Sequence, residues 1–430
     1  MLLQEYGSPV RIEGDAQQLL RLIEDTNVYW QNQLGLRNAP LEVVPSEDGV
    51  VRVRARGVTG QVRIGRHDLH IAPKYLPPDE VERWQESLFD ILAFADTPAF
   101  RQSSFIRGRV GSGGFIDLLA QSYADTLELA LERGAPRGYK QSKELLGTAR
   151  GRLLTEELYP QVLQNPSKLL FETDEFSKNI VLTRLLHWAC DRFSDLVNNT
   201  AIRNDLLNVK QQFAGVPAQK PPETTLDRFF LSPKHRHYEN AFTIAKWLAQ
   251  QQGPNLAPGQ VEIPGVLLKS RTIYQGFIDS CLRHISNSNG WEYKDEPTRA
   301  LAFGIKTIST TPDHYLVANG EQILLDSKYK GKTEWTEEEG HSGTPLRNQD
   351  VYQIMAGSRV FNTPKAVLIY PSISERFEGV WQIEGEGLPR MLYTVQIDPV
   401  KFTQDSRDEF LSQVAEELQR IIDYEEEESD

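Results

Sequence analysis

Three side chains between residues 310 and 331 have types and a spacing suited to phosphodiester hydrolysis. Asp313 follows a proline, and the apolar run ILLDSK later delivers Asp326 and Lys328. Two strand-like stretches, residues 314–317 and 322–327, lie in this interval and are separated by the turn signal Ala-Asn-Gly. A hairpin brings the start of one strand beside the end of the next. We therefore expect the two carboxylates to lie side by side.

The chemistry expected of this group is metal-dependent. In a strand, Asp326 and Lys328 point to one face and Ser327 points away. Two carboxylates are hard oxygen ligands suited to Mg²⁺ or Mn²⁺. Such an ion polarises a scissile phosphate and lowers the pKa of a bound water, while an ammonium stabilises developing charge. The pattern predicts Asp313 and Asp326 as metal ligands. The alternative is that Asp313 begins a turn and the other two form a solvent-side pair on an edge strand.

The elements around this group predict a mixed sheet flanked by helices. Apolar periodicity and β-type runs alternate after residue 226, as that architecture requires. Helices are expected at residues 237–252, 270–287 and 349–361, and strands at 301–309, 314–317, 322–327 and 366–370. Residues 331–347 have no periodicity and are expected to form a loop.

The preceding part of the chain is predicted to be β-rich and then helical. A helix is expected at residues 15–32, followed by two alternating runs up to Pro77 that are typical of a hairpin or meander. Three amphipathic helices are expected between residues 80 and 213, and the proline-rich residues 213–224 are interpreted as a connection between domains. The resulting prediction is an α+β multidomain chain with a β-rich domain at 1–80, a helical region and linker at 81–225, and a C-terminal domain at 226–425 with an acidic tail.

The charge of the chain is unevenly distributed. The formal net charge is −13, of which residues 401–430 carry −8, whereas residues 133–152 carry +5. Six bases in that second segment are candidate DNA contacts: Arg133, Arg137, Lys140, Lys143, Arg150 and Arg152. The alternative is a solvated helix face. The acidic total argues against strong stand-alone DNA binding, so we expect a partner to supply much of the affinity.

Several function classes are excluded by what the sequence lacks. No apolar run approaches the length of a membrane span, and the first residues have no signal-peptide pattern. The two cysteines, Cys190 and Cys281, have no CxxC partner, which favours buried thiols in a cytoplasmic protein. There is no G-x-x-x-x-G-K-[ST] loop, and the GSGG at residues 111–114 is expected to be a flexible turn.

Blocks along most of the chain beyond about residue 60 resemble the McrC family, the nuclease subunit of McrBC-type modification-dependent restriction systems. The C-terminal blocks are TTPDH, ILLDSKYK, NQDVYQIMA and AVLIYP, in the order and spacing of the family's nuclease domain. The N-terminal blocks are LHIAPKYLP, LERGAPRGYKQSKELLGTARGRL and FETDEFSKNIVLTRLL.

The resemblance implies a C-terminal PD-(D/E)xK nuclease fold with Asp313, Asp326 and Lys328 as its catalytic set. Gln353 then corresponds to a glutamine behind the active site that orients a phosphate or the metal-bound water; its alternative is a surface amide. Tyr352 is expected to pack. Two departures from the family pattern stand out. Lys269 and Gln275 occupy positions where acids are expected, and Gly357 stands where the family often has tyrosine. Gln275 remains a possible weak ligand through its carbonyl.

The resemblance also implies partners. McrC proteins work with a GTP-hydrolysing AAA+ ring of the McrB type, on which their N-terminal half docks and whose hydrolysis it stimulates. By this analogy an arginine-rich hairpin is a candidate ring contact, with a solvated face as the alternative. Its arginines are Arg52, Arg54, Arg56, Arg63 and Arg66. The other expected partner is double-stranded DNA.

Three functional hypotheses follow. The first is an Mg²⁺- or Mn²⁺-dependent endonuclease subunit that cleaves DNA delivered by an AAA+ GTPase or ATPase ring. The second is an adaptor that activates the ring and has lost efficient cleavage, which the missing acids at Lys269 and Gln275 favour. The third is a nuclease with a different defence or repair partner. Nothing in the sequence resembles a module that reads a particular base.

Overall fold

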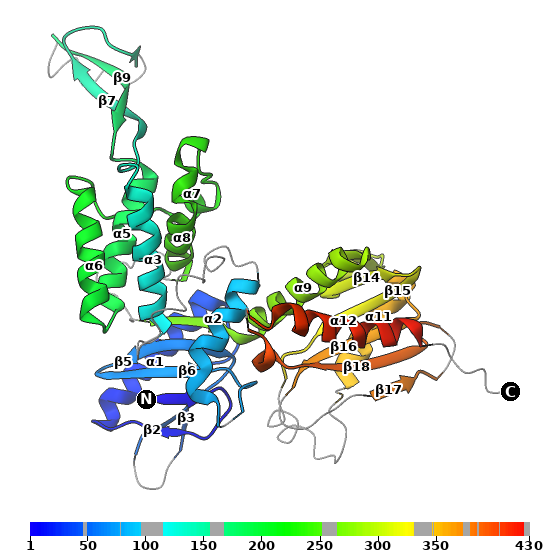
Figure 1. The fold of residues 1–430 in the computed structure, drawn as a ribbon. Coiled ribbons are helices and arrows are strands. Elements are labelled where there is room, and N and C mark those ends of the chain that lie inside the picture. The colour runs from blue at the N-terminus through cyan, green and yellow to red at the C-terminus, as the bar shows by residue number, and fades with distance from the viewer. Residues whose placement is uncertain are drawn as a thin grey trace. The chain divides into compact units, whose positions relative to one another are not determined.

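The computed structural model shows two compact units. It describes residues 1–45, 50–77, 79–95, 115–154, 167–251, 265–330, 346, 348–372, 379–384, 387–403 and 405–424. Unit 1 combines Met1–Ser103 with Ile263–Asp430, and unit 2 is Ser104–Glu262 (Figure 1). One compact unit can hold several domains, so the boundaries proposed at residues 80 and 225 stay predictions. Within the described ranges, no helix is both long and apolar enough to cross a membrane.

The N-terminal part of unit 1 contains two small sheets and one helix. The first sheet has the order β1-β6-β5-β10, comprising β1 (Leu2–Gln4), β6 (His67–Ala72), β5 (Val58–Ile64) and β10 (Gly265–Lys269). The second has the order β2-β4-β3, comprising β2 (Val10–Arg11), β4 (Arg52–Ala55) and β3 (Leu41–Val44). Helix α1 (Ala16–Leu34) begins at the N-cap Asp15, whose carboxylate accepts from the Gln18 N–H, and buries Ile23 and Trp30 in the core between these elements.

The arginine-rich stretch is not one hairpin. Strands β5 and β6 pair as predicted, but β4 and β5 belong to different sheets. Gly57, at a φ of 67°, lies between β4 and β5. Gly60 lies on β5 where β10 packs so closely that a Cβ would come within 2.2 Å of the Val266 carbonyl oxygen. The partner of β5 is thus a strand about two hundred residues away, which alternation alone does not reveal.

The C-terminal part of unit 1 is a six-stranded mixed sheet with the order β11-β14-β15-β16-β18-β17. Its strands are β11 (Glu292–Asp295), β14 (His314–Ala318), β15 (Glu321–Ser327), β16 (Lys365–Pro371), β18 (Met391–Ile397) and β17 (Gly379–Gln382). Its helices are α9 (Ser270–Asn289), α11 (Asn348–Phe361) and α12 (Arg407–Asp423), and α2 (Trp84–Phe94) also packs on α9. The predicted mixed sheet flanked by helices is confirmed, including the hairpin of β14 and β15.

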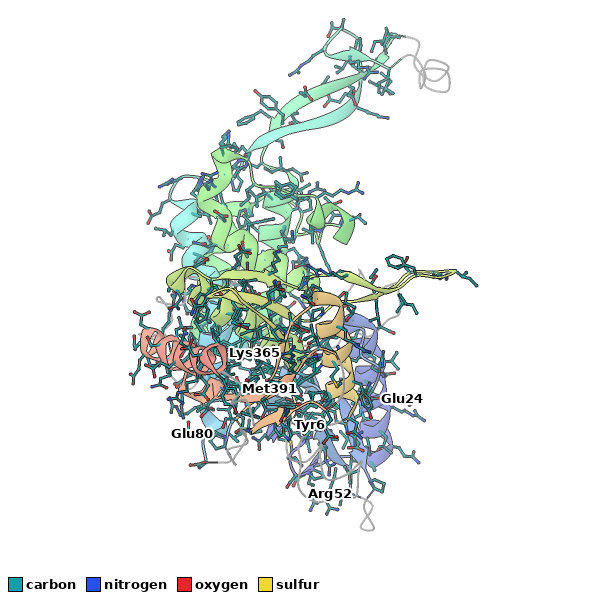
Figure 2. The ribbon with its side chains drawn as sticks, turned by 90° about the vertical axis from the view of Figure 1, so that its right-hand side faces the viewer. Tyr6, Glu24, Arg52, Glu80, Lys365 and Met391 are labelled. Atoms are coloured by element: carbon teal, nitrogen blue, oxygen red, sulfur yellow. The ribbon has the colours of Figure 1, made fainter. Side chains whose placement is uncertain are left out.

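The centre of this sheet is parallel and buried. Strand β16 runs parallel to both β15 and β18, with Lys365 opposite Met391, two residues labelled in Figure 2. Residues 366–370 of β16, AVLIY, are fully buried, as expected of a parallel strand covered on both faces. One strand prediction was wrong. Residues 301–309 do not form one strand; instead β12 (Arg299–Ala302) and β13 (Ile308–Thr310) pair with each other outside the main sheet.

Unit 2 is a helical bundle that also carries a β-sheet. Its helices include α3 (Phe115–Leu131), α5 (Val181–Leu196), α6 (Thr200–Lys210), α7 (Glu223–Asp227) and α8 (Glu239–Gln251). The sheet has the order β7-β9-β8, from β7 (Gly138–Leu146), β9 (Leu169–Ser177) and β8 (Arg152–Leu153). It extends beyond the ends of the helices of this unit (Figure 1). The three helices predicted between residues 80 and 213 are present as α2, α3 and α5, whereas the sheet of β7, β8 and β9 was not predicted.

The proline-rich residues 213–224 lie inside unit 2 and contact its helices. His187 of α5 hydrogen-bonds the Val216 carbonyl through Nδ1 at 2.8 Å, and the Gln219 N–H donates to the Arg184 carbonyl at 3.4 Å. Three other sequence predictions fall outside the described residues: the loop at 331–347 except Leu346, the GSGG turn, and residues 425–430 of the tail.

Candidate functional site

The hairpin of β14 and β15 brings Asp313 and Asp326 together. His314 lies opposite Leu325 in the register, so Asp313 at the start of β14 lies beside Asp326 near the end of β15. The Ser327 backbone N–H donates to Asp313 Oδ2 at 2.9 Å. Both carboxylates are buried, with Asp326 only 1% exposed. The sequence prediction that these two acids converge is confirmed in geometry.

Lys328 joins the same group from the end of β15. Its Nζ lies 2.6 Å from Asp326 Oδ2 and donates to Gln353 Oε1 at 3.0 Å. Gln353 lies on α11, which packs against β15 and β16. The lysine is 4% exposed, so its charge is compensated by these partners and not by bulk water. All four predicted catalytic side chains thus form one connected cluster.

The carboxylate pair holds more negative charge than its protein partners compensate. Burial, and then the hydrogen bonding and negative charge of Asp326, raise the pKa of Asp313 to about 8. With both acids ionised, Asp326 Oδ1 is buried and receives no hydrogen bond from any described residue. A divalent cation would supply the missing charge and the missing contact. The two aspartates therefore fit an Mg²⁺ site by their chemistry.

Gln275 lies at this site, at a position where the family resemblance led us to expect an acid. Its Nε2 donates to Asp313 Oδ1 and to Glu296 Oε1, both at 3.1 Å. The side chain of Gln275 is therefore oriented as a donor to Asp313. Lys269 ends β10, where it is the N-cap residue of α9, and its Nζ lies near Gly35 at the C-terminal end of α1. The lysine side chain is thus directed toward the N-terminal part of unit 1.

Glu296 is a third acid that sequence reasoning missed. It follows β11 at a φ of 42°, and its N–H donates to the Asp313 carbonyl at 2.9 Å. The available signal was the Glu-Pro sequence directly after the run EYKD, because an acid just past a strand is well placed to reach the same end of the sheet. Through Gln275, the exposed Glu296 carboxylate is linked to Asp313.

A hydrogen-bonded chain runs behind the carboxylates, from the buried Ser327 and His314 to two half-buried side chains. His314 Nε2 lies 2.7 Å from Ser327 Oγ, and His314 Nδ1 lies 2.7 Å from the Tyr293 hydroxyl, which donates to Asp279. Burial lowers the pKa of His314 to about 4, which keeps the ring neutral. This chain holds Ser327, whose N–H in turn holds Asp313. None of its members was singled out from the sequence.

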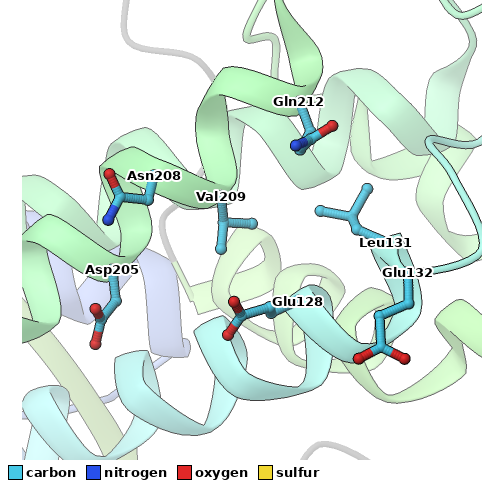
Figure 3. Close-up of a pocket in the computed structure, with 7 residues that line it drawn as sticks. All are labelled: Glu128, Leu131, Glu132, Asp205, Asn208, Val209 and Gln212. Atoms are coloured by element: carbon cyan, nitrogen blue, oxygen red, sulfur yellow. The ribbon is translucent and has the colours of Figure 1, made fainter.

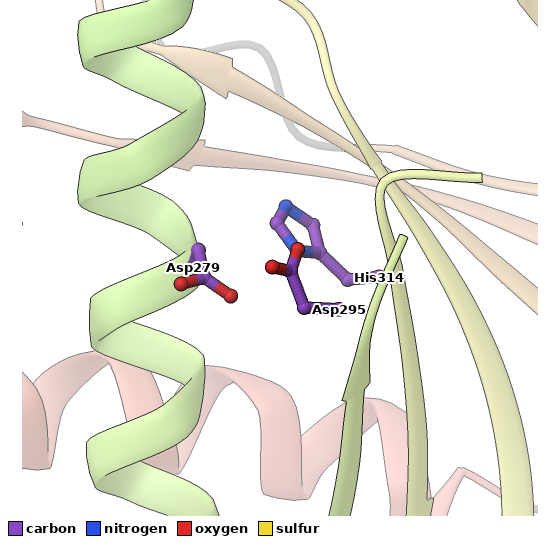
Figure 4. A group of neighbouring side chains, drawn as sticks. All are labelled: Asp279, Asp295 and His314. Atoms are coloured by element: carbon purple, nitrogen blue, oxygen red, sulfur yellow. The ribbon is translucent and has the colours of Figure 1, made fainter. Parts of the chain in front are cut away.

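Asp279, Asp295 and His314 also offer ligand atoms within 4.8 Å of one another (Figure 4). Their charges are already engaged, because Arg283 reaches Asp279 Oδ2 at 3.0 Å and Asp295 Oδ2 at 3.8 Å. Tyr293 occupies the other oxygen of Asp279 and His314 Nδ1. The group is best described as a structural network supporting β14.

Comparison with known proteins assigns the family. Residues 53–371 match the model of the McrBC 5-methylcytosine restriction system component. The chain belongs to the McrBC family. It also resembles a chain of the refined half-complex from a tetradecameric assembly of Thermococcus gammatolerans McrB AAA+ hexamers with bound McrC, at 15% identity and a TM-score of 0.64 over 97% of this chain and 99% of that one. This likeness concerns the fold.

A second solved structure, the cryo-EM structure of the Thermococcus gammatolerans McrBC complex, matches at 16% identity and a TM-score of 0.46, over 66% of this chain and 87% of that one. No curated protein sequence matches the chain.

In this McrBC-family chain the six candidate DNA-contact bases lie in unit 2, whereas the carboxylate group belongs to unit 1. Arg133 follows α3, Arg137 precedes β7, and the remaining four lie on or between β7 and β8. Their positive charge is partly balanced by β9, because Lys143 lies opposite Glu172 and Arg152 lies 4.0 Å from that same acid. DNA contact by these residues stays a prediction.

The five arginines considered as ring contacts of the McrBC-family chain lie in two sheets. Arg52 and Arg54 are on β4, which Arg56 follows, whereas Arg63 is on β5 and Arg66 is in its turn to β6. Several are paired with acids of their own sheet: Arg56 reaches Glu42 at 2.7 Å, and Arg63 reaches Asp68 at 2.7 Å. Their role as partner contacts stays a prediction.

Unit 2 also has a hollow of about 390 Å³ between α3 and α6 (Figure 3). Its lining includes the acids Glu128, Glu132 and Asp205, with Leu131 and Val209 as apolar walls. The described residues that line it include no lysine, arginine, histidine, serine, threonine or cysteine. Among these residues the acids of the hollow therefore have no counterpart of Lys328.

Proposed function

We propose that this chain is the DNA-cleaving subunit of an McrBC-type restriction complex, with a PD-(D/E)xK nuclease site formed by Asp313, Asp326 and Lys328. The single observation that carries the proposal is the convergence of two buried carboxylates and a buried ammonium at one end of a mixed sheet. That arrangement suits hydrolysis of a phosphodiester bond, in which water attacks phosphorus and a P–O bond of the backbone breaks.

Asp313 and Asp326 would hold an Mg²⁺ or Mn²⁺ ion. When bound, such an ion neutralises charge on the scissile phosphate and makes a nearby water more acidic. The protein's own groups then position the reactants. Lys328, oriented by Asp326 Oδ2 and Gln353 Oε1, is placed to donate to a phosphate oxygen and stabilise the charge that develops on it. Gln353 uses its oxygen on Lys328, and its amide NH₂ suits a phosphate oxygen or the attacking water.

The partners proposed are double-stranded DNA and an AAA+ ring of the McrB type. Family membership supports the ring, and the solved complex with a similar fold contains McrB hexamers with bound McrC. The net charge of −13 supports the same proposal, because a chain this acidic gains DNA affinity from a partner that binds DNA. The basic residues of the β7-β9-β8 sheet and the arginines of β4 and β5 are the proposed contacts.

The test is reconstitution with an AAA+ protein of the McrB type. DNA containing 5-methylcytosine and unmethylated DNA are incubated with the complex, nucleotide and Mg²⁺, and cleavage is followed on gels. Wild-type chain is expected to cut in an Mg²⁺-dependent manner, and the isosteric Asp326→Asn chain is expected to bind the ring and not cut. Equal cleavage by the Asp326→Asn complex would contradict the proposal.

A second candidate function is a ring-activating adaptor with weak or absent cleavage. Gln275 favours it, because its amide donates to Asp313 Oδ1 where the family expects an acid that would strengthen cation binding. A Gln275→Glu variant distinguishes the two. It should raise metal affinity and cleavage if the chain is a nuclease. If the chain is an adaptor, metal binding and cleavage should both stay undetectable in the Gln275→Glu variant, and stimulation of ring hydrolysis should be unchanged.

A further inference from the structure

Two buried charged residues lie just past the C-terminal ends of two strands of the N-terminal sheet. Strands β1 and β6 pair in parallel, with Gln4 opposite Ala72, so the residues that follow them meet at the same edge. Those residues include Glu5, 2% exposed, and Lys74, 6% exposed. A buried charge without a partner destabilises a fold. The groups that contact Glu5 and Lys74 therefore indicate what these two charges do.

The shared partner of both charges is Tyr329, the residue after Lys328. The Tyr329 hydroxyl donates to Glu5 Oε2 at 2.7 Å. Lys74 Nζ donates to the Tyr329 backbone carbonyl at 3.2 Å and lies 4.3 Å from the centre of its ring. The Lys74 backbone N–H lies 3.3 Å from the Tyr329 hydroxyl as a further donor. The tyrosine is thus fixed at its hydroxyl, its ring and its main chain by the N-terminal sheet.

This attachment matters because β15 ends at Ser327. Beyond it, the Lys328 N–H still donates to the Ile369 carbonyl at 2.8 Å, and the Lys330 N–H turns back to the Lys328 carbonyl at 3.0 Å. The peptide between these points is no longer part of a strand ladder. Its position is set by the contacts of Tyr329 and by the ion pair of Lys330 with Asp350 on α11, and the direction in which Lys328 leaves the backbone depends on that peptide.

We propose that Glu5 and Lys74 are positioning residues for the nuclease site, acting through Tyr329 on Lys328. The N-terminal sheet thereby forms part of the catalytic apparatus without touching substrate. The same sheet reaches the site by a second path, since β10 leads directly into α9, which carries Gln275. The inference rests on the proposed function, and it assigns a role to the LHIAPKYLP block, which contains Lys74 and which the catalytic set leaves unexplained.

The test compares Lys74→Met and Tyr329→Phe in the reconstituted complex with the AAA+ partner and 5-methylcytosine DNA. Each is expected to lower the single-turnover cleavage rate at saturating DNA and Mg²⁺, by about 10-fold to 100-fold for Lys74→Met and less for Tyr329→Phe, as for groups that orient a catalytic residue. The dissociation constant for DNA and the stimulation of ring hydrolysis should each change by less than about 2-fold. For comparison, a tenfold change in a dissociation constant corresponds to about 1.4 kcal/mol.

Lys365→Met is the matched control. Lys365 is a half-buried lysine of unit 1, and its Nζ, like that of Lys74, donates to a backbone carbonyl, that of Ile422 at 2.7 Å. It begins β16, at the opposite end of that strand from Ile369, which holds the Lys328 N–H. The variant should lose stability and keep the cleavage rate of the folded complex. If Lys74→Met chain does not fold, Tyr329→Phe, which removes one oxygen, carries the test.

The outcomes separate this inference from the proposed function. An unchanged cleavage rate in folded Lys74→Met and Tyr329→Phe complexes overturns the positioning role. A parallel loss of cleavage, DNA affinity and ring stimulation also overturns it, because that pattern indicates general unfolding. Asp326→Asn is run beside them. If that variant still cuts, the nuclease assignment itself has failed, whatever the Lys74 variants do.

Discussion

Two antiparallel strand pairs of this molecule carry acidic and basic side chains, but these side chains lie in different surroundings. In the β14–β15 hairpin the charged groups are buried at one end, where Asp326 and Lys328 lie 2.6 Å apart. In the β7–β9 pair, the exposed Lys143 lies opposite the half-buried Glu172, and Tyr139, which lies opposite Phe176 on the same two strands, is 77% exposed.

The difference is the environment of the charges. Burial strengthens the interactions between the charges at the end of β14 and β15. Burial itself, and then the interaction with Asp326, raise the pKa of Asp313. Surface pairs such as Lys143 and Glu172 are screened by water and contribute little to stability. The first region is therefore suited to chemistry, and the second to contact with a charged partner.

The sharpest way to break this comparison is to neutralise one lysine in each region. Lys328→Met is expected to lower the cleavage rate by about 10²-fold to 10³-fold, because it removes charge stabilisation at the phosphate. Lys143→Met should leave the rate at saturating DNA unchanged, since its amine belongs to an exposed strand of unit 2. Single-turnover cleavage by the reconstituted complex measures both. Equal losses in the two variants would contradict the distinction.

A smaller effect is expected at α11. Gln353→Ala removes the acceptor that orients Lys328 and should lower the cleavage rate by about 10-fold. The neighbouring Tyr352 is 67% exposed on the same helix, so Tyr352→Ala serves as the control and should cleave at the wild-type rate. If the tyrosine variant were the slower of the two, Gln353 would not be the group that acts on Lys328.

The buried carboxylates predict a pH effect on stability in the absence of metal. In the folded chain the pKa of Asp313 is raised to about 8, whereas the pKa of an aspartate in the unfolded chain is about 4. The free energy of unfolding should therefore fall as pH rises between these values. The difference between wild type and Asp313→Asn, from denaturant melts in EDTA, isolates this contribution. Saturating Mg²⁺ should flatten it, because the ion binds the ionised carboxylate.

The smallest effect is expected in the exposed region. Replacing Lys143, Arg150 and Arg152 together by glutamine should weaken DNA binding by the complex. The salt dependence of log K should fall by about 0.9 for each phosphate that these bases no longer neutralise. Fluorescence anisotropy at several salt concentrations measures the slope. An unchanged slope would show that these bases do not bind phosphates.

A feature was predictable from the sequence when the residues that determine it lie close together along the chain. The hairpin of β14 and β15, and with it the meeting of Asp313 with Asp326, needed only a local turn signal and alternating residues. Helices α1, α3, α5 and α9 followed from apolar periodicity within each segment. These parts were predictable because their determinants lie close together in the chain.

Features built from distant segments were not predictable from the sequence. The pairing of β10 with β5 depends on a close approach at Gly60, and the attachment of Tyr329 joins residues more than three hundred positions apart. The β7–β9 sheet was missed because GYKQSKELL has the composition of a helix, while its strand state is set by pairing with residues 169–177. Glu296 was missed because a single acid after a short strand forms no repeating pattern in the sequence.

The central claim is that Asp313 and Asp326 together bind a divalent cation, and direct measurement of Mn²⁺ binding tests it most closely. Titration of the chain with Mn²⁺, followed by electron paramagnetic resonance of the free ion, should show one site that Mg²⁺ competes for. That site should be lost in Asp326→Asn and kept in the control Asp174→Asn, on β9 of unit 2. Mn²⁺ binding that persists unchanged in Asp326→Asn would contradict the account.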